Sequence, residues 1–268
     1  MTSSYETKPK ILQTCRFARG RESEQFTHEH VFSYQIAGTL TVNDGHKTYT
    51  CNEGNFRLLR KKRLAKFKKT PPENGQFQII SIYLDDETLQ KFSNEFNLKA
   101  EKTTEIPDTL ITFKPHPLYI SFMDSLWVYL QLPENEQRIV MDIKIKEAVQ
   151  IMLKVNPELK DILFDFSTPG KIDIEEFMLK NFHFNVQLNR FAYLTGRSLS
   201  TFKRDFEKIF HTTPSRWLTQ RRLQEAYYLI KEKGRKPSDV YMDVGFEDLS
   251  HFSYAFKKQY GVAPSALI

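Results

Sequence analysis

The chain of 268 residues reads LSTFKRDF at residues 199–206 and, fifty residues later, LSHFSYAF at residues 249–256. Thr213-Pro214-Ser215 follows the first stretch and Ala263-Pro264-Ser265 the second, so a leucine, two phenylalanines and a Pro-Ser pair keep one register. Repetition at a fixed offset indicates two copies of one supersecondary unit. The residues around each copy predict that this unit is helix, tight turn and helix, which favours a protein that enters the major groove of DNA.

The first copy carries signals for both helices and for the turn between them. Residues 188–194 have helical apolar spacing, and Gly196 is placed to end that helix. Ser198 can cap a second helix, whose apolar stripe is Leu199, Phe202, Phe206, Ile209 and Phe210. The opposite face carries Ser200, Thr201, Lys203, Arg204 and Lys208. Hydroxyl groups and cations of this kind bind bases and phosphates, so we expect these five residues to contact DNA.

The second copy follows the same plan. We expect Ser238 to cap its first helix, Gly245 to form the turn and Asp248 to cap its second helix. The side chains expected to be buried in that second helix are Leu249, Phe252, Phe256 and Tyr260. Those expected to face outward and contact DNA are Ser250, His251, Ser253 and Tyr254. A protein-binding pair of helical hairpins with a basic face is the alternative interpretation of this half.

A long helix is expected to join the two copies. Residues 216–231 place Leu223, Ala226, Tyr227 and Ile230 on one face. Sixteen residues at about 1.5 Å each make a helix about 24 Å long. Such a strut could hold two reading helices in successive turns of the major groove, which are about 34 Å apart.

Composition describes an ordinary globular protein with a basic C-terminal half. Hydrophobic residues make up 40% and charged residues 27% of the chain. From Phe166 onward, 16 Lys and Arg stand against 11 Asp and Glu, whereas the remainder has 23 against 22. This distribution favours a polyanionic partner, although charge alone does not distinguish DNA from RNA.

No targeting or membrane segment is expected. The first residues lack the apolar core of a secretion signal, and charged residues interrupt the apolar runs near Ile111 and Ile151. The two cysteines, Cys15 and Cys51, form neither a disulfide framework nor a metal-finger spacing. The sequence therefore predicts a cytoplasmic protein.

The N-terminal half is expected to consist of strands followed by helices. β-branched and aromatic runs continue to about Leu84, with a hairpin turn signal at Asn43-Asp44-Gly45, and the pattern becomes helical from about Thr88. Residues 139–153 are apolar on more than one face, which favours a helix that also packs on a dimer partner. Turn-forming residues at 167–170 mark the linker, so the expected domains are 1–165 and 166–268.

Residues 172–268 resemble the DNA-binding domain of the AraC/XylS family of bacterial transcription regulators. The markers are Arg222-Leu223-Gln224-Glu225-Ala226, Val244-Gly245-Phe246, Ser250-His251-Phe252, Phe256-Lys257-Lys258 and Gly261-Val262-Ala263-Pro264-Ser265. The resemblance implies that eight of the outward residues named above contact bases, namely Ser200, Thr201, Lys203, Arg204, Ser250, His251, Ser253 and Tyr254. It also implies an α+β fold, with an N-terminal cupin-like β-barrel, a helical dimerisation segment and a C-terminal all-α double helix-turn-helix domain.

A cupin-like domain raises the question of a metal site. His28-Glu29-His30 places two histidines at alternate positions, which point the same way along a strand. Tyr34 and Gln35 stand where the carboxylate ligand of a cupin enzyme should be, and residues 55–63 contain no histidine. Two of four ligands are too few for a stable site, so we expect no metal and no other cofactor.

A basic run extends from Arg60 to Lys69 with Leu64 and Phe67 interleaved. We interpret it as a solvated hairpin turn with an apolar inner face and a basic rim. The alternative is a docking surface for an acidic partner, an acidic ligand or the DNA backbone.

The sequence as a whole predicts a DNA-binding transcription regulator that is controlled through its N-terminal domain and has no catalytic constellation. The resemblance implies double-stranded DNA, RNA polymerase and a second copy of the chain as partners, and a small-molecule effector or a regulatory protein as the signal. The alternative is a cupin-like metalloenzyme domain fused to a DNA-binding tail. Elemental analysis of the purified protein for metal at His28 and His30 would distinguish the two.

Overall fold

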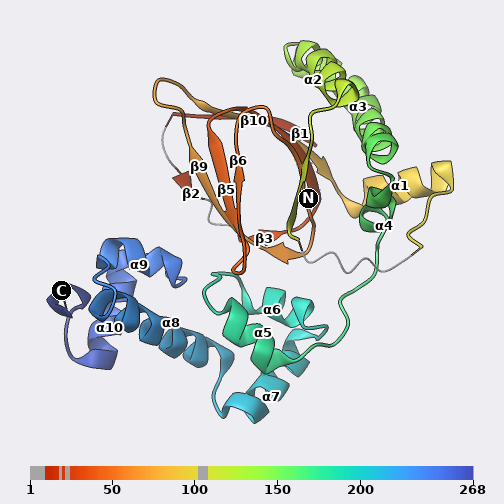
Figure 1. The fold of residues 1–268 in the computed structure, drawn as a ribbon. Helices are drawn as coiled ribbons and strands as arrows, with labels where there is room; N and C mark the ends of the chain where they lie inside the picture. Colours follow the sequence, from red (N-terminus) through yellow and green to blue (C-terminus); the bar gives the residue numbers. More distant parts are fainter. Residues whose placement is uncertain (1–9, 18–19, 22–24, 102–107, 268) are drawn as a thin grey trace, which may run out of the picture. The chain divides into compact units, whose positions relative to one another are not determined.

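The computed structural model describes residues 10–17, 20–21, 25–101 and 108–267, which form two compact units (Figure 1). The first unit extends to Ser167, and the second begins at Thr168. Phe26 and Leu64–Lys66 also belong to the second unit, and Phe26 and Leu64 pack into its hydrophobic core. Each unit is described below by itself.

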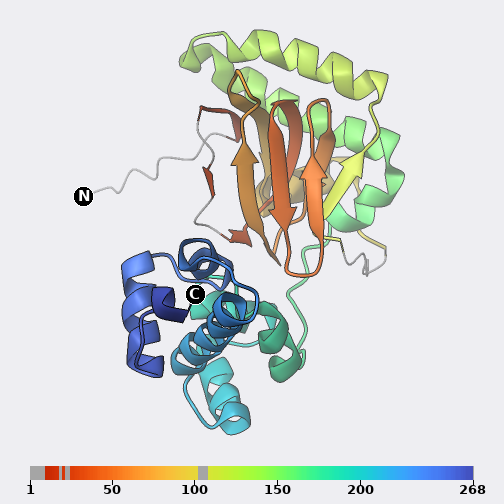
Figure 2. The same cartoon turned by 60° about the vertical axis from the view of Figure 1, so that its left-hand side comes forward.

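The strands of the first unit form two facing sheets (Figures 1 and 2). One sheet has the order β1 (Ile11–Arg16), β10 (Phe77–Leu84), β4 (His30–Ala37), β7 (Phe56–Leu59) and β11 (Leu110–Phe113). The other has the order β2 (Gly20–Arg21), β9 (Lys66–Thr70), β5 (Thr39–Asn43) and β6 (Thr48–Cys51). A two-stranded sheet pairs β3 (Phe26–Thr27) with β8 (Arg63–Leu64). The predicted β-rich N-terminal domain is confirmed.

The hairpin of β5 and β6 shows why these residues form strands. Burial alternates along both strands, with Leu40 and Val42 on one and Tyr49 and Cys51 on the other turned away from solvent. The turn includes Gly45 at a φ of 90°, a backbone conformation that side chains with a Cβ rarely adopt. The turn predicted at Asn43-Asp44-Gly45 is therefore confirmed.

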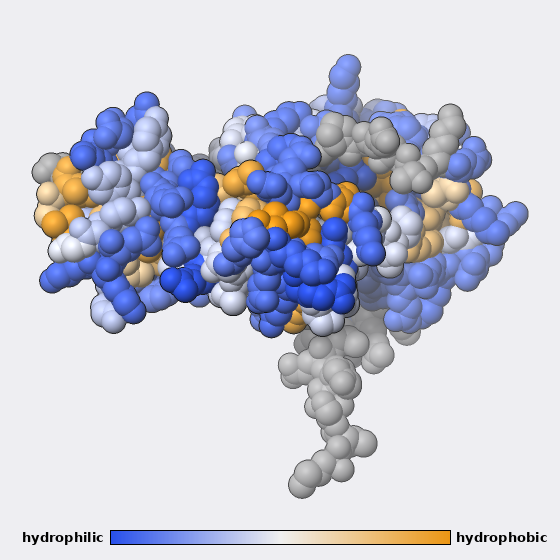
Figure 3. All heavy atoms as spheres, turned by 90° about the horizontal axis from the view of Figure 1, so that it is seen from below, coloured by the Kyte–Doolittle hydropathy of each residue, from blue (hydrophilic) through white to orange (hydrophobic). Residues whose placement is uncertain are grey.

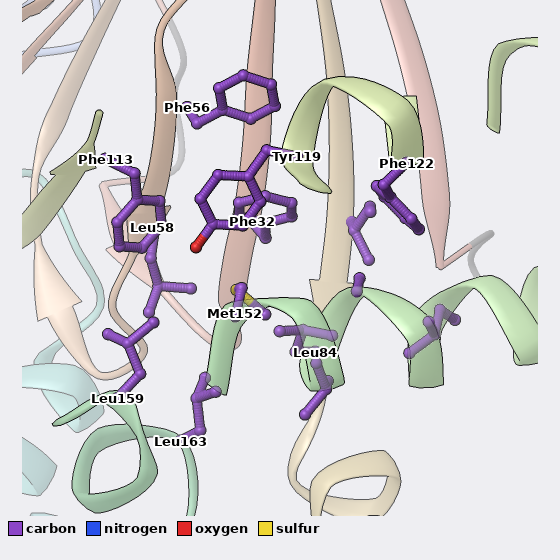
Figure 4. Close-up of a cluster of buried hydrophobic side chains, with 14 of the residues drawn as sticks. Phe32, Phe56, Leu58, Leu84, Phe113, Tyr119, Phe122, Met152, Leu159 and Leu163 are labelled. Carbon is purple, nitrogen blue, oxygen red and sulfur yellow. The ribbon is translucent and has the colours of Figure 1, made fainter. Parts of the chain in front are cut away.

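Aromatic rings attach the helices of this unit to its five-stranded sheet (Figure 4). Phe32 of β4 and Phe56 of β7 contact the ring of Tyr119, with centroid separations of 5.5 and 5.2 Å. Tyr119 lies on α2 (Pro117–Leu130), and Met152 of α3 (Glu134–Val155) joins the same cluster. Burial of such rings is among the larger contributions to core stability.

The helices of the first unit confirm one expectation and correct another. The long helix expected over residues 139–153 is present as α3. The expectation of helices alone after Thr88 is wrong, because α1 (Asp86–Phe96) is followed by β11, which pairs with β7 through Leu110 and Leu59. A short 3₁₀ turn (Pro157–Leu159) and α4 (Lys160–Leu163) end the unit.

From Thr168 onward, the regular structure of the second unit is helical among the residues described, as predicted. Its helices are α5 (Ile174–Asn181), α6 (Leu188–Leu194), α7 (Leu199–Phe210), α8 (Pro214–Lys231), α9 (Pro237–Asp243) and α10 (Leu249–Tyr260), followed by a 3₁₀ turn (Pro264–Leu267). Two hydrophobic clusters lie along α8: Leu218 packs with α5, α6 and α7, whereas Leu223, Ala226 and Ile230 pack with α9 and α10. Each helix-turn-helix therefore has its own core, and α8 belongs to both.

Two local expectations about the second unit are wrong. Ser238 does not cap α9, because Pro237 is its first residue and Lys236 takes the N-cap position without a side-chain hydrogen bond. Leu249 is 40% exposed rather than buried.

Figure 3 shows one face of the molecule, where apolar patches lie among mostly hydrophilic residues. Among the residues described, no helix has the length and apolar composition required to cross a membrane.

Candidate nucleic-acid interface

The helix predicted to read DNA in the first copy, α7, is held by a cap at its start and by phenylalanines along one side. The Ser198 side chain accepts a hydrogen bond from the Thr201 N–H at 3.3 Å, as predicted, and Gly196 turns the chain at a φ of 67°. Phe202 and Phe206 are fully buried. Residues four apart share one face of a helix, so Ser200, Arg204 and Lys208 form a row, and all three are exposed.

The helix predicted to read DNA in the second copy, α10, repeats this construction. The Asp248 carboxylate accepts a hydrogen bond from the His251 N–H at 2.7 Å, and Phe252 and Phe256 are fully buried. The row that corresponds to Ser200, Arg204 and Lys208 consists of Ser250, Tyr254 and Lys258, which are exposed. The repeat in the sequence is thus a repeat of cap, core and outward face.

All of the residues predicted to contact DNA lie on these two helices. Most are exposed, namely Ser200, Lys203, Arg204, Lys208, Ser250, His251 and Tyr254. Thr201 and Ser253 are half-buried. Arg204 has a side chain that is 65% exposed and a single marginal ion pair, 3.5 Å from Asp205. Tyr254 is the more exposed of the two large hydrophobic side chains that α10 presents to solvent, at 69% against 40% for Leu249.

The joining helix extends further than expected and ties the two halves together. It begins at Pro214, two residues before the predicted start, and contacts α7, α9 and α10. Arg222 is largely buried and donates hydrogen bonds from Nε to the Phe182 carbonyl at 2.8 Å and from Nη2 to the Phe184 carbonyl at 2.7 Å. Burial lowers the pKa of Arg222 to about 10, which leaves it charged at neutral pH.

Further contacts join the loop after α5 to the turn of the second helix-turn-helix. The Asn185 side-chain amide donates a hydrogen bond to the Glu247 carboxylate at 2.6 Å. A Cβ at Gly245 would lie 2.8 Å from Arg222 Nε and 2.8 Å from the His183 carbonyl oxygen. The backbone of the second turn thus packs directly against Arg222 of the joining helix.

Several arginines of the first half are engaged inside the unit rather than displayed on its surface. Arg197 pairs with Asp205 at 3.2 Å and donates to two backbone carbonyls. Arg221 lies over the Phe182 ring and pairs with Glu225, and Arg190 lies over the Phe26 ring. The exposed cations on or next to the reading helices are Lys203, Arg204, Lys208, Arg216, Lys257 and Lys258.

A groove of about 670 Å³ lies between α8 and α10. Arg216 and Gln220 line it from α8, and His251, Tyr254 and Lys258 line it from α10. The sequence interpretation gave no DNA-contacting role to Arg216 or Lys258. The fifty-residue offset was the signal that could have identified Lys258, because Lys258 is the equivalent of Lys208 in the second copy.

The candidate metal site at His28 and His30 in the first unit does not have the expected geometry. His28 is exposed and His30 is buried, so the expectation that the two side chains point the same way is wrong. Burial and the charges of Lys61 and Arg60 lower the pKa of His30 well below its usual value. The buried Arg57 guanidinium donates to Gln35 Oε1 at 3.0 Å, so a positive charge lies where a cupin enzyme has its carboxylate ligand. In the part of the chain that the structure describes, no cluster of three metal-ligating side chains is present.

The basic run is more ordered than the predicted solvated turn. Lys61 is buried and pairs with Asp86, and Lys69 is buried with its ammonium group over the Phe77 ring. Lys66 belongs to the second unit and donates a hydrogen bond to the Asp243 carbonyl at 2.6 Å. The expectation of a fully solvated basic rim is therefore wrong for these lysines.

Comparison with known proteins agrees with this division of roles. Residues 191–268 match a family described as a helix-turn-helix domain, and residues 30–162 match the ExsA N-terminal regulatory domain. The chain is 23% identical over 247 residues to the virulence regulon transcriptional activator VirF of Yersinia enterocolitica, covering 86% of this chain and 85% of that protein. It is 24% identical over 235 residues to the HTH-type transcriptional regulator ExsA of Pseudomonas aeruginosa, covering 86% and 82%.

Among solved structures, a ToxT variant in its apo form from Vibrio cholerae aligns over 97% of both chains, at 14% identity and a TM-score of 0.47. The matched domains and the full-length relatives together identify the class of protein. The chain belongs to the AraC/XylS family of bacterial transcription regulators. It joins an N-terminal regulatory domain to a helix-turn-helix domain that binds DNA.

Proposed function

We propose that α7 and α10 enter two major-groove turns of one operator and read it through the nine residues predicted from the sequence. The observation that carries this proposal is the pair of capped helices whose exposed rows, Ser200–Arg204–Lys208 and Ser250–Tyr254–Lys258, occupy the same register. Eighteen residues of α8 make a strut about 27 Å long between them. Side chains of these types hydrogen-bond base edges and phosphates.

The second unit should bind DNA by itself. We expect a fragment of residues 166–268 to bind duplex DNA, with an affinity that falls steeply as salt rises, because lysine and arginine contacts release counterions from the phosphates. Fluorescence anisotropy with a labelled duplex at several salt concentrations would measure this. The matched control is the fragment of residues 1–165. A folded 166–268 fragment with no more affinity for DNA than the control would overturn the proposed function.

Homodimerisation is proposed for the first unit, through α2 and α3. Both helices expose apolar side chains that its core does not use: Val128 is 62% exposed and Ile143 is 60% exposed. Trp127 is also 41% exposed. Surface patches of this kind are typical of interaction sites, and α3 contains the segment that the sequence singled out for dimerisation.

Charge on this surface should separate the dimer without unfolding the chain. Ile143→Glu combined with Val128→Glu is expected to give a folded monomer, because the two carboxylates would have to be desolvated in the interface. Light scattering would report the mass and circular dichroism the fold. Phe17→Glu, at another exposed apolar residue of the first unit, should remain dimeric. A dimeric 166–268 fragment beside a monomeric 1–165 fragment would contradict the assignment.

We also propose that RNA polymerase is a partner and that the chain acts in the cytoplasm without catalytic activity. The relatives are named as a transcriptional activator and a transcriptional regulator, which supports the first point. The buried Arg57 beside Gln35 disfavours a cation in the first unit, which weakens the metalloenzyme alternative. The signal is proposed to be a small-molecule effector or a regulatory protein received by the first unit. A thermal-shift screen of metabolites beside a pull-down would separate these two.

A further inference from the structure

The groove between α8 and α10 is built from two matched helix faces. On α8 its lining residues include Arg216, Gln220 and Leu223, and on α10 they include Tyr254 and Lys258. Residues spaced by three, four and seven positions share one face of a helix, so each helix turns a single face into the groove. Leu223 is buried and provides the floor, whereas the polar side chains are nearer solvent.

The charge of this groove has one sign. Arg216 and Lys258 approach it from opposite walls, and the described residues that line it include no aspartate or glutamate. Neither cation has an ion pair or hydrogen bond with another described residue, unlike Arg197, Arg221 and Arg222 of the same unit. Two uncompensated cations on facing walls are suited to an anion with a linear backbone.

The position of the groove indicates which anion it meets. His251 and Tyr254 line it and also belong to the predicted reading face of α10. A DNA strand that leaves the major groove at α10 would therefore pass directly into it. Lys258 stands at the place in α10 that Lys208 occupies in α7, so it continues the reading row toward the groove.

We propose that the groove between α8 and α10 seats one sugar–phosphate strand of the operator, with Arg216 and Lys258 bound to phosphates. This inference rests on the proposed binding of DNA by α7 and α10 and adds the joining helix to the contact surface. Gln220 of α8 adds an amide that can donate to a phosphate oxygen. The seat serves affinity and register, and it carries no base specificity.

The test uses the full chain with two duplexes of equal length, one selected from a random pool by the wild-type protein and one of mixed sequence. Arg216→Ala and Lys258→Ala should each weaken binding to both duplexes about 10- to 150-fold, as expected for loss of a charged hydrogen bond. Each should reduce the slope of log affinity against log salt by about 0.9. The control is Lys231→Ala, which removes the same charge from α8 outside the groove and should leave both quantities unchanged.

A second measurement locates the phosphates. Single phosphates of the selected duplex are replaced by neutral methylphosphonates. Replacement at a seated phosphate should weaken the wild-type complex and leave the Arg216→Ala or Lys258→Ala complex unaffected, since the contact is already lost. Failure of the wild-type chain to bind either duplex would refute the proposed function itself. If Arg216→Ala and Lys258→Ala bind both duplexes as tightly as the wild type, only the phosphate seat is refuted. The seat is also refuted if these variants lose promoter activation while their DNA affinity is unchanged. That result would assign the groove to a protein partner.

Discussion

Gly245→Ala is expected to destabilise the second unit by about 2–4 kcal/mol, the sum of a strained backbone and a steric conflict. Gly245 has a φ of 102°, which residues with a Cβ rarely adopt. The new methyl group would lie 2.8 Å from Arg222 Nε and 2.8 Å from the His183 carbonyl oxygen. The carbonyl is backbone and cannot rotate away, so Arg222 would have to give up its hydrogen bonds.

Gly261→Ala provides the matched control for this prediction. Gly261 also has a positive φ, 77°, but nothing lies within 4 Å of the position that a methyl group would occupy there. We expect it to cost about 1–2 kcal/mol from backbone strain alone. Amide hydrogen exchange of α9 and α10 in the full chain would compare the stability of the two variants. We expect Gly245→Ala to show faster exchange and weaker DNA binding than Gly261→Ala. Equal destabilisation by the two substitutions would show that the contact with Arg222 contributes nothing.

Arg204→Ala is expected to weaken binding to a selected operator by about 1–3 kcal/mol and to relax specificity in one half of the site. Tyr254→Ala should cost less on the same operator. Residues 181–222 carry a net charge of +6, whereas residues 236–268 carry −1, and phosphate neutralisation supplies much of the affinity for DNA. The first helix-turn-helix should therefore anchor the protein, and the second should depend more on sequence.

Part of the positive charge counted in residues 181–222 is not exposed to DNA in the structure. Arg197, Arg221 and Arg222 are committed to contacts inside the unit, so the exposed excess of charge in the first half is smaller than the count suggests. Arg204 is the one arginine of α7, and its side chain is 65% exposed. Titrations of both variants at one salt concentration would decide the matter. Equal losses, or a larger loss from Tyr254→Ala, would refute the unequal division of labour.

The repeated stretch predicted the architecture of the second unit well because its signals are local. Ser198 and Asp248 cap helices through their own side chains, and the phenylalanines recur at helical spacing. The same logic failed at Ser238, where the neighbouring Pro237 starts the helix. Local pattern also missed β11, since its few residues become a strand only by pairing with β7.

The candidate site was predictable to the extent that exposure follows helical periodicity. What the sequence could not provide is the partner of each charge. The charge count of residues 181–222 includes Arg222, yet its guanidinium is engaged by the carbonyls of Phe182 and Phe184. Arg216 was expected as the first residue of the joining helix, and it lines one groove with Lys258 of the second copy because α8 contacts α10. Such relations depend on tertiary packing and not on spacing.

Because α8 belongs to two cores, it determines how the two helices predicted to read DNA are rotated relative to one another. Leu218 is fixed in one core and Leu223 in the other, so the residues between them determine the rotation of one half relative to its neighbour. One inserted residue would turn the second half by about 100° and shift it by about 1.5 Å. Both halves could remain folded while facing different sides of the duplex. The length of this one segment of α8 should therefore determine the spacing between the two half-sites that the chain can bind.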